Sequence, residues 1–384
     1  MTLINLDIML RFLAFGVASG DAMRNMTRWV MEILSMMSNM VGGNLARILG
    51  TERMAFRLDD RWVWDFWFTQ EGGRTHLFFL QAPKSIGDPD KRHWHVSIGH
   101  AVSEDLVNWI DVGEVLRPAN APAWDDYTTW TGTVIRAPQG HWLMYYTGTS
   151  REEDGLVQRI GVASSLDLLS WERGASNPVL QLPDNTYYET LDKTVWYEEA
   201  CRDPWVFPDP DGRGWHMVFT AREPSGPSIG RGVIGHATSD DLYEWTLQPP
   251  LFRSHVFAHM EVPQVFEWQG HWYCVFCTAA NLIDNDYAGA AMSEPMTGTH
   301  YLMADHPLGP WQLVPGDFLL GDPAGKLYAG RVLPRPDGSM CMMAFLKHSD
   351  DARFVGELTD PLPLAMNEDG SLSVDATSVF GPSL

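Results

Sequence analysis

Cysteine is scarce in this chain. Its 384 residues include only four, Cys201, Cys274, Cys277 and Cys341. Four scattered cysteines are too few for a scaffold held together by disulfides. Cys274 and Cys277 have the spacing of a metal-binding pair, but they lie in an apolar strand pattern, where residues three apart point to opposite faces. We therefore expect four free, mostly buried thiols and no metal site.

Basic residues are also under-represented. The chain has 27 Lys and Arg against 49 Asp and Glu, which gives a formal net charge of −22 and an isoelectric point near 4.8. Nucleic acids and anionic membranes both bind through basic surface, so neither is an expected partner. A small-molecule or oligosaccharide substrate is compatible with this charge. The sequence gives no prediction of the oligomeric state.

Long apolar runs and phosphate-binding loops are absent as well. The apolar stretch 3–20 is interrupted by Asp7 and Arg11 and has no basic segment before it. Neither a membrane span nor a clear secretory signal is therefore predicted. The glycines at 72–73 and Gly226 lack the context of a phosphate loop and are expected to form turns. We expect no cofactor and a cytoplasmic location, with secretion as the alternative.

Residues 1–53 differ in pattern from the rest of the chain. Between residues 23 and 49, apolar residues recur with helical spacing and put Trp29, Ile33 and Met37 on one face. We expect a short N-terminal helical extension over residues 1–53. Because Met54 directly precedes the first repeat, a native start at Met54 is the alternative.

The rest of the chain repeats a single unit. The repeated pattern is Ser-x-Asp-Leu-x-x-Trp, and it ends at Trp109, Trp171, Trp245 and, in a degenerate form, Trp311. These tryptophans lie 62, 74 and 66 residues apart, a period typical of a four-stranded propeller blade with long loops. A fifth unit follows over residues 326–358. The sequence predicts an all-β fold, a five-bladed β-propeller over residues 54–364, followed by a C-terminal tail, 365–384.

Three acidic residues occupy matching positions in these units. Asp65, Asp203 and Glu261 each lie among apolar residues, ahead of a Gly-containing turn and an apolar strand. If the units repeat in structure, the three carboxylates begin equivalent innermost strands and converge on one axis. Like charges in an apolar pocket repel one another and lose hydration, so folding alone does not explain them. Paired carboxylates with separated pKa values are what glycoside hydrolysis uses.

Four motifs in order resemble those of the β-fructosidase superfamily, glycoside hydrolase families 32 and 68. They are the Ser-x-Asp-Leu-x-x-Trp repeat, Trp130-Thr-Gly-Thr133, Arg202-Asp203-Pro204 and Glu261-Val-Pro263, and the resemblance covers roughly residues 58–360. It implies that Asp65 is the nucleophile, Asp203 the transition-state stabiliser and Glu261 the acid/base.

The resemblance also implies residues that line the sugar subsite. Arg202, Trp64 and Trp130 resemble the lining residues of the family, and Thr131 stands where the family usually has serine. Three further candidates come from position alone. His259 is two residues before Glu261 and therefore on the same strand face, while Tyr328 and Arg331 lie in the innermost strand of the fifth unit.

These residues predict a retaining, double-displacement mechanism on β-fructosyl linkages of sucrose or fructans. Asp65 must be ionised to attack, although its aromatic neighbours raise its pKa, so a cation is needed and Arg202 is the candidate. Glu261 must keep its proton to higher pH, which burial and two neighbouring carboxylates favour.

The motif around Asp65 is nearer to that of levansucrases than to the Asn-Asp-Pro-Asn-Gly usual in family 32. Hydrolysis and fructosyl transfer are therefore both expected as alternatives.

Two other functions remain open. An inverting arabinanase or xylosidase of the family 43 type would use Asp65 as the base that activates water. The other alternative is a catalytically silent propeller that only binds carbohydrate.

Overall fold

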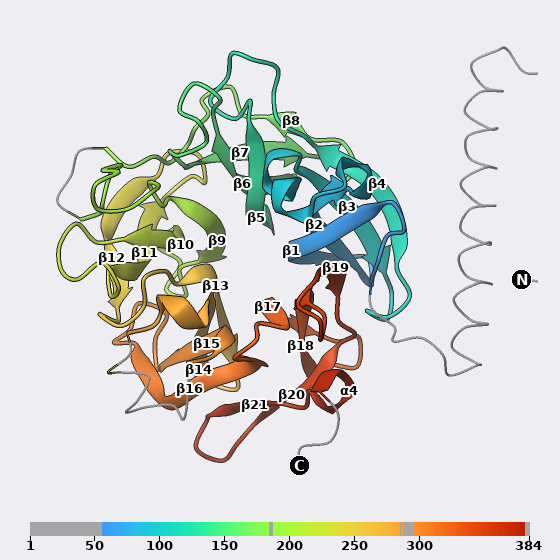
Figure 1. Ribbon diagram of the computed structural model, residues 1–384, viewed down its shortest axis with the longest axis vertical. Coiled ribbons are helices and arrows are strands. Elements are labelled where there is room, and N and C mark those ends of the chain that lie inside the picture. Colours follow the sequence, from blue (N-terminus) through green and yellow to red (C-terminus); the bar gives the residue numbers. More distant parts are fainter. Residues whose placement is uncertain (1–55, 184–186, 285, 287–294, 381–384) are drawn as a thin grey trace, which may run out of the picture. The chain divides into compact units, whose positions relative to one another are not determined.

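Five antiparallel sheets surround a common centre in the computed structural model (Figure 1). The structure describes residues 56–183, 187–284, 286 and 295–380. The predicted all-β, five-bladed propeller is confirmed. The helical extension predicted for residues 1–53 lies outside the described residues.

Each of the first four sheets contains four consecutive strands. The first consists of β1 (Arg61–Glu71), β2 (Arg74–Pro83), β3 (Ser97–Ser103) and β4 (Ile110–Leu116). The second consists of β5 (Thr128–Arg136), β6 (Trp142–Thr149), β7 (Arg159–Ser165) and β8 (Glu172–Arg173). The third consists of β9 (Arg202–Pro208), β10 (Trp215–Arg222), β11 (Gly232–Ser239) and β12 (Thr246–Arg253). The fourth consists of β13 (Glu261–Trp268), β14 (His271–Thr278), β15 (Thr297–Ala304) and β16 (Gln312–Asp322).

The fifth sheet differs because its third position is divided between two strands. It consists of β17 (Leu327–Pro334), β18 (Met340–His348), β19 (Phe354–Leu358), β20 (Leu362–Met366) and β21 (Leu372–Val374). Both β19 and β20 pair with β18. Strand β21, within the residues expected to form a tail, pairs with β20, and a short helix α4 (Thr377–Phe380) follows it. Three short 3-10 helices, η1 (Lys84–Ile86), η2 (Pro89–Trp94) and η3 (Ala280–Leu282), lie in loops.

The Ser-x-Asp-Leu repeat forms the same tight turn before three of the outer strands. In the first blade, Asp105 Oδ1 accepts the backbone N–H of Val107 at 2.9 Å and that of Asn108 at 2.7 Å. Leu106, between Asp105 and Val107, has a φ of 63°. Asp167 and Asp241 accept the corresponding bonds in the second and third blades. The side-chain carboxylate thus satisfies the backbone donors of the turn.

Every innermost strand carries a β-bulge at a corresponding place. The register with the neighbouring strand shifts next to Asp65 in β1, Thr131 in β5, Asp203 in β9, Val262 in β13 and Ala329 in β17. Three of these residues have positive φ angles, 59° at Asp203, 53° at Val262 and 50° at Ala329. A bulge redirects a side chain out of the regular alternation of a strand. The five bulges therefore allow side chains at corresponding places to face the centre of the ring.

The first and last blades are joined where the ring closes. Leu358 of β19 donates its backbone N–H to the carbonyl of Phe56 at 2.9 Å, and the two residues form an isolated β-bridge. The Phe56 ring packs edge-on against Phe79 of β2, with centroids 5.1 Å apart. Residues 302 positions apart in the chain are thus neighbours in the sheet.

The four cysteines are free and buried, as predicted. Burial raises the pKa of the Cys274 and Cys277 thiols to about 12, and it raises the pKa of the Cys201 thiol as well. They therefore behave as small apolar groups of the core.

Candidate active site

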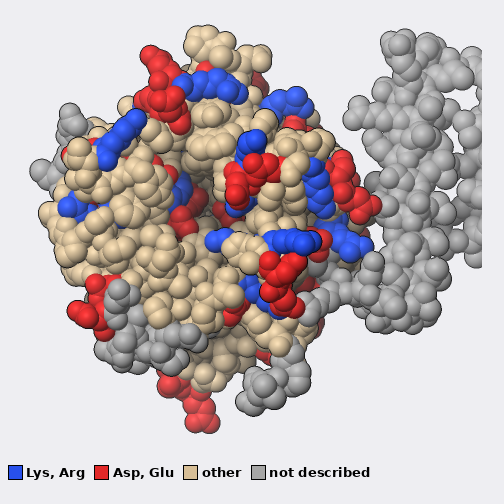
Figure 2. Space-filling view, viewed as in Figure 1, with Lys and Arg blue, Asp and Glu red and all other residues tan. Residues whose placement is uncertain are grey.

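Asp65, Asp203 and Glu261 lie close together at the centre of the ring. Burial, and after it the charges of Asp203 and Glu261, raise the pKa of Asp65. Such a mutual effect requires the three carboxylates to be near neighbours. A space-filling view shows a hollow at the centre of the ring, with both acidic and basic side chains inside and around it (Figure 2). The bulged innermost strands therefore bring together the three acids that the repeat singled out.

Glu261 is held by two side chains. Arg202 donates from Nη2 to Oε1 at 2.6 Å, and the Tyr328 hydroxyl donates to Oε2. Burial by itself raises the pKa of Glu261, but the Arg202 charge and the hydrogen bonds from Tyr328 and Arg202 outweigh it. They lower the pKa to about 2. Glu261 is therefore ionised in this arrangement.

Asp65 has fewer stabilising partners. Thr131 donates its hydroxyl to Oδ2 at 3.0 Å, and the Arg331 charge acts in the same direction. Burial is the larger effect, and together with the charges of Asp203 and Glu261 it raises the pKa of Asp65 to about 7. Asp65 is thus the carboxyl of this group that holds a proton near neutral pH.

The order of these two pKa values is the reverse of the sequence prediction. We expected Arg202 to compensate the charge of Asp65 and Glu261 to retain the proton. Arg202 instead contacts Glu261 and lies 3.5 Å from Asp203, while the positive charges that act on Asp65 include those of Arg331 and Arg92. Which acid a buried arginine reaches depends on side-chain geometry, and no motif spacing determined it.

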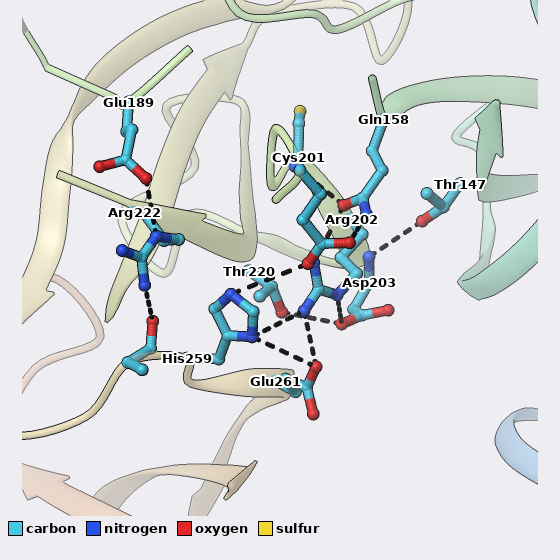
Figure 3. A network of polar contacts seen from close by, with 12 residues as sticks. Thr147, Gln158, Glu189, Cys201, Arg202, Asp203, Thr220, Arg222, His259 and Glu261 are labelled. Carbon is cyan, nitrogen blue, oxygen red and sulfur yellow. Dashed lines mark hydrogen bonds and ion pairs between the residues drawn. The ribbon is translucent and has the colours of Figure 1, made fainter. Parts of the chain in front are cut away.

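Hydrogen bonds hold both the side chain and the backbone of Asp203 in place (Figure 3). Its Oδ2 accepts from the Thr220 hydroxyl at 2.8 Å and from the Val262 backbone N–H at 3.2 Å. Its own backbone N–H donates to Thr147 Oγ1 at 3.0 Å. Burial raises its pKa even though Arg202 opposes the change. A carboxylate held this rigidly needs no rearrangement to accept hydrogen bonds from a sugar.

Arg202 contacts three carboxylates and links them into one network (Figure 3). Besides Glu261 and Asp203, its Nη1 donates to Glu198 Oε1 at 2.8 Å. Its side chain is only 9% exposed. Glu198 was not among the predicted site residues, because it lies in the loop before β9, outside the repeated Ser-x-Asp-Leu-x-x-Trp pattern. The guanidinium is planar and holds its N–H donors in a fixed arrangement, so one arginine can bind several carboxylates.

His259 contacts the guanidinium of Arg202. Arg202 Nη2 approaches His259 Nδ1 at 3.1 Å, and since arginine can only donate, Nδ1 is the unprotonated ring nitrogen. The ring packs edge-on against Trp196 at 5.2 Å, and the side chain is 1% exposed. Burial and Arg202 hold the pKa of His259 well below its ordinary value, so the ring is neutral. Its observed part is to orient Arg202; a contact with substrate stays a prediction.

The other predicted lining residues fall into two groups. Thr131 and Tyr328 hydrogen-bond to Asp65 and Glu261, as described above. Trp64 is 1% exposed, whereas Trp130 is partly exposed and donates its indole N–H to the His93 carbonyl at 3.2 Å. Whether any of them touches a sugar stays a prediction.

Arg331 is fully buried. It donates from Nε to the Phe66 carbonyl at 3.2 Å and from Nη1 to the carbonyls of Val262 at 3.1 Å and Pro263 at 2.9 Å. Three innermost strands, β1, β13 and β17, are thereby tied at their bulges.

The sequence did not identify the segment Pro89–Trp94, which forms η2 beside the site. Arg92 Cζ lies 5.7 Å from the centre of the Trp64 ring, and the ring of His93 lies 5.9 Å from it. Trp94, 38% exposed, lies 6.1 Å from Trp130. A run of basic and aromatic residues in a loop was the available signal, but this run of residues does not recur in the other repeats.

Among the described residues, no group of three or more His, Cys, Asp and Glu side chains has the arrangement needed to hold a metal ion. No helix within the described part of the chain is both long and apolar enough to cross a lipid bilayer.

Comparison with known proteins identifies the family. The model of the glycosyl hydrolases family 32 N-terminal domain matches residues 67–367, a range that includes Asp203 and Glu261 and begins two residues after Asp65. The chain belongs to glycosyl hydrolase family 32. This membership agrees with the resemblance recognised from the motifs.

Curated relatives of this family 32 chain match it over part of their length. A beta-fructofuranosidase of Arabidopsis thaliana, insoluble isoenzyme CWINV6, is 28% identical over 50% of the chain and 33% of the relative. A fructan 1-exohydrolase of Leymus chinensis is 32% identical over 44% of the chain and 26% of the relative. The matches thus span about a third or less of these relatives.

Solved structures share the fold over most of the chain. An inulosucrase from Halalkalicoccus jeotgali, bound to kestose, has a TM-score of 0.69 at 22% identity and covers 84% of this chain and 89% of its own. The catalytic domain of a beta-fructofuranosidase from Microbacterium saccharophilum has a TM-score of 0.66 at 18% identity, over 84% and 82%. At these identities the likeness concerns the fold alone.

Proposed function

We propose that this family 32 chain is a retaining glycoside hydrolase or fructosyltransferase that acts on β-fructosyl linkages of sucrose or fructans. The observation that carries the proposal is the meeting of Asp65, Asp203 and Glu261 in one pocket of a family 32 propeller. Three carboxylates held close together cost folding free energy, and glycosidic bond cleavage is the chemistry that uses them.

In the first step, a carboxylate oxygen of Asp65 forms a bond to the anomeric carbon as the bond to the leaving oxygen breaks. Glu261 donates its proton to that oxygen. In the second step, water or a sugar hydroxyl gives a proton to Glu261, its oxygen bonds to the anomeric carbon, and Asp65 is released. Asp203 accepts hydrogen bonds from sugar hydroxyl groups, and these bonds strengthen as positive charge develops on the ring.

The pKa values of Asp65 and Glu261 fit this mechanism if a proton moves from Asp65 to Glu261 when substrate binds. The pKa of Asp65 is about 7 and that of Glu261 about 2, so a proton that these two acids hold near neutral pH lies on Asp65. Sugar hydroxyl groups that donate to Asp65 and Asp203 favour their ionised forms, so the proton then belongs on Glu261. Because the carboxylates of the pocket share this proton, loss of the proton removes activity whichever carboxylate carries it.

We expect kcat/KM for sucrose to fall above about pH 7, by about tenfold for each further pH unit. The reason is that Asp65, whose pKa is raised to about 7, loses the proton of the pocket in this range. A pH profile of initial rates from pH 4 to 9 measures the effect. A profile that stays flat up to pH 9 would show that the pocket needs no proton with this pKa.

The direct test of the function is product analysis after incubation with sucrose, inulin and levan. Hydrolysis of sucrose releases glucose and fructose in equal amounts, whereas transfer leaves an excess of glucose. Proton NMR during the first minutes should show β-fructose appearing before its other forms, because two inversions retain the anomeric configuration. Absence of any fructose release from all three substrates would favour the silent carbohydrate-binding alternative.

The family 43 alternative has lost its support. Membership of family 32 was established by a match over residues 67–367, and an inverting mechanism would require first release of the opposite fructose anomer. The NMR experiment separates the two outcomes.

A further inference from the structure

A second buried ion cluster lies next to the network of the active site. Glu189, in the loop before β9, accepts from Arg222 Nε at 2.8 Å (Figure 3) and also from Arg231 Nη1. Arg222 is the last residue of β10 and is 1% exposed. Within the described residues, it has no hydrogen bond or ion pair with the three acids of the pocket. An effect of Arg222 on the chemistry must therefore pass through other residues.

Hydrogen bonds hold all three nitrogens of the Arg222 guanidinium. Besides the bond from Nε to Glu189, Nη1 donates to the Ala258 carbonyl at 2.7 Å and Nη2 donates to the Ser228 carbonyl at 3.2 Å. A planar guanidinium that is bound at each nitrogen forms a rigid support for its neighbours. Ala258 directly precedes His259, so one of these bonds fixes the backbone beside the ring of His259.

The ring of His259 depends on packing for its orientation. Its Nδ1 accepts from Arg202, but its buried Nε2, which carries the hydrogen, has no hydrogen-bond partner among the described residues. Glu198 Oε1 lies 3.8 Å from Nε2, which is beyond hydrogen-bond distance. One hydrogen bond leaves the ring free to turn, so a second contact must fix its plane. The ring of Trp196, edge-on at 5.2 Å, supplies such a contact.

Trp196 also depends on packing for its position. Its indole Nε1 is buried and has no hydrogen-bond partner in the described part of the chain. Arg222 covers the indole instead, with Cζ 3.8 Å from the centre of the ring. A guanidinium over an indole face is attracted by the π electrons, more strongly where water is excluded. The path of contacts therefore runs from Arg222 through Trp196 to His259. It continues through Arg202 to Glu261.

We propose that Arg222 is a positioning residue that fixes the ring of His259 and so keeps the acid/base Glu261 in place. The proposal rests on the proposed function, because Glu261 has this role only if the chain cleaves glycosidic bonds. The charge of Arg222 acts in the same sense as its contacts. Burial, Arg202 and Arg222 all lower the pKa of His259, against the opposing effect of Glu261. The ring is thus kept neutral, and only a neutral ring can accept a hydrogen bond at Nδ1.

A competing explanation is that Arg222 only contributes an ion pair to stability. Its loss would then reduce the amount of folded chain and lower the rate on every substrate by the same factor. A misplaced Glu261 has a different effect, because only a poor leaving group needs its proton. The loss should then fall on sucrose and spare a nitrophenyl β-fructoside. The ratio of the two kcat/KM values is the deciding quantity, since it does not depend on how much of the chain is active.

Arg222→Met should lower kcat/KM for sucrose by about tenfold or more, and that for the nitrophenyl fructoside by about threefold or less. Trp196→Leu should show the same selective loss, and it decides the question if Arg222→Met does not fold. Equal losses on both substrates would overturn the proposal.

The matched control is Arg231→Met, which removes the other arginine bound to Glu189. Among the described residues, Arg231 has no hydrogen bond with Ala258 and does not lie over Trp196. Arg231→Met should therefore keep the ratio of the two kcat/KM values within about twofold of that of the unmodified chain, even if stability falls.

Nitrogen NMR of the histidine rings separates this proposal from the proposed function, because it requires no activity. His259→Asn identifies the signals of His259 by their absence. The unmodified chain should show one tautomer, with Nδ1 hydrogen-bonded. Arg222→Met should shift or broaden the Nδ1 signal, whereas Arg231→Met should leave it unchanged.

The two failures can be told apart. An unchanged Nδ1 signal in Arg222→Met would overturn the positioning role of Arg222. A shifted signal, in a chain that cleaves neither fructoside, would overturn the proposed function and leave the path of contacts from Arg222 to His259 standing.

Discussion

Asp65→Ala is expected to lower the turnover of sucrose by at least about 1,000-fold, because no other group in the pocket can take over the bond to the anomeric carbon. Asp203 is held by Thr220 and the Val262 backbone, and Glu261 by Arg202 and Tyr328, so neither is free to move into its place. Initial rates of glucose release measure the loss. Asp65→Ala should nevertheless fold, since it removes a carboxylate that burial and like charges disfavour.

Glu261→Gln should cause a similar loss on sucrose for a different reason, and the difference can be measured. Its role is to protonate the leaving oxygen, which a good leaving group does not require. A fructoside with an activated aryl leaving group should therefore recover much of its rate with Glu261→Gln but not with Asp65→Ala.

Asp209→Asn is the matched control for both variants. Asp209 is also buried, but it contacts His216 in the third blade and does not act on the catalytic group. It should keep turnover within about threefold even if stability falls. Retention of more than about a tenth of the sucrose turnover in Asp65→Ala or Glu261→Gln would reject their assigned roles.

Arg202→Met is expected to lower the free energy of unfolding by about 3–5 kcal/mol at pH 7, the cost of leaving buried acids without their cation. Three carboxylates lose a partner at once: Glu198, Asp203 and Glu261. Activity should fall as well, since Glu261 would no longer be held in place. Urea unfolding at a series of pH values measures the effect on stability.

The pH dependence of this loss has a definite sign. Arg202 and the other contacts lower the pKa of Glu261 to about 2 in the folded chain, below its ordinary value of 4.5. The stability that this contact contributes is therefore present above about pH 4.5 and is lost as the pH falls towards 2. The difference between Arg202→Met and the unmodified chain should shrink over that range. An equal difference at pH 3 and pH 7, or a loss below about 1 kcal/mol, would contradict the proposed role of Arg202.

The repeat explains why the fold and the three acids could be predicted from the sequence. The Ser-x-Asp-Leu turn depends on a side chain bonding to its own backbone, so its residues must recur wherever the turn recurs. The innermost strand of each blade has a bulge at a corresponding place, and so residues at equal positions in the repeats arrive at equal positions around the centre. Asp65 and Asp203 lie at these bulges and Glu261 directly precedes one, so the three acids could be recognised for this reason.

Residues outside the repeat could not be predicted in the same way. Glu198 reaches Arg202 from a loop, and Arg92 reaches the pocket from η2, whose residues do not recur in the other repeats. The predicted order of the pKa values of Asp65 and Glu261 was wrong for a related reason. It depends on whether the guanidinium of Arg202 reaches Asp65 or Glu261, a choice made by a few ångströms of side-chain geometry that spacing in the sequence does not record.

The bridge between Phe56 and Leu358 has a consequence for the life of the chain during synthesis. A ring closed by its first and last blades cannot be completed while the last blade is still inside the ribosome, so the earlier blades must wait as an open arc with exposed edges. Tyr328, which bonds Glu261, also emerges late. The nascent chain is therefore expected to acquire its working pocket in one final event, and to rely until then on the cell's protection against aggregation.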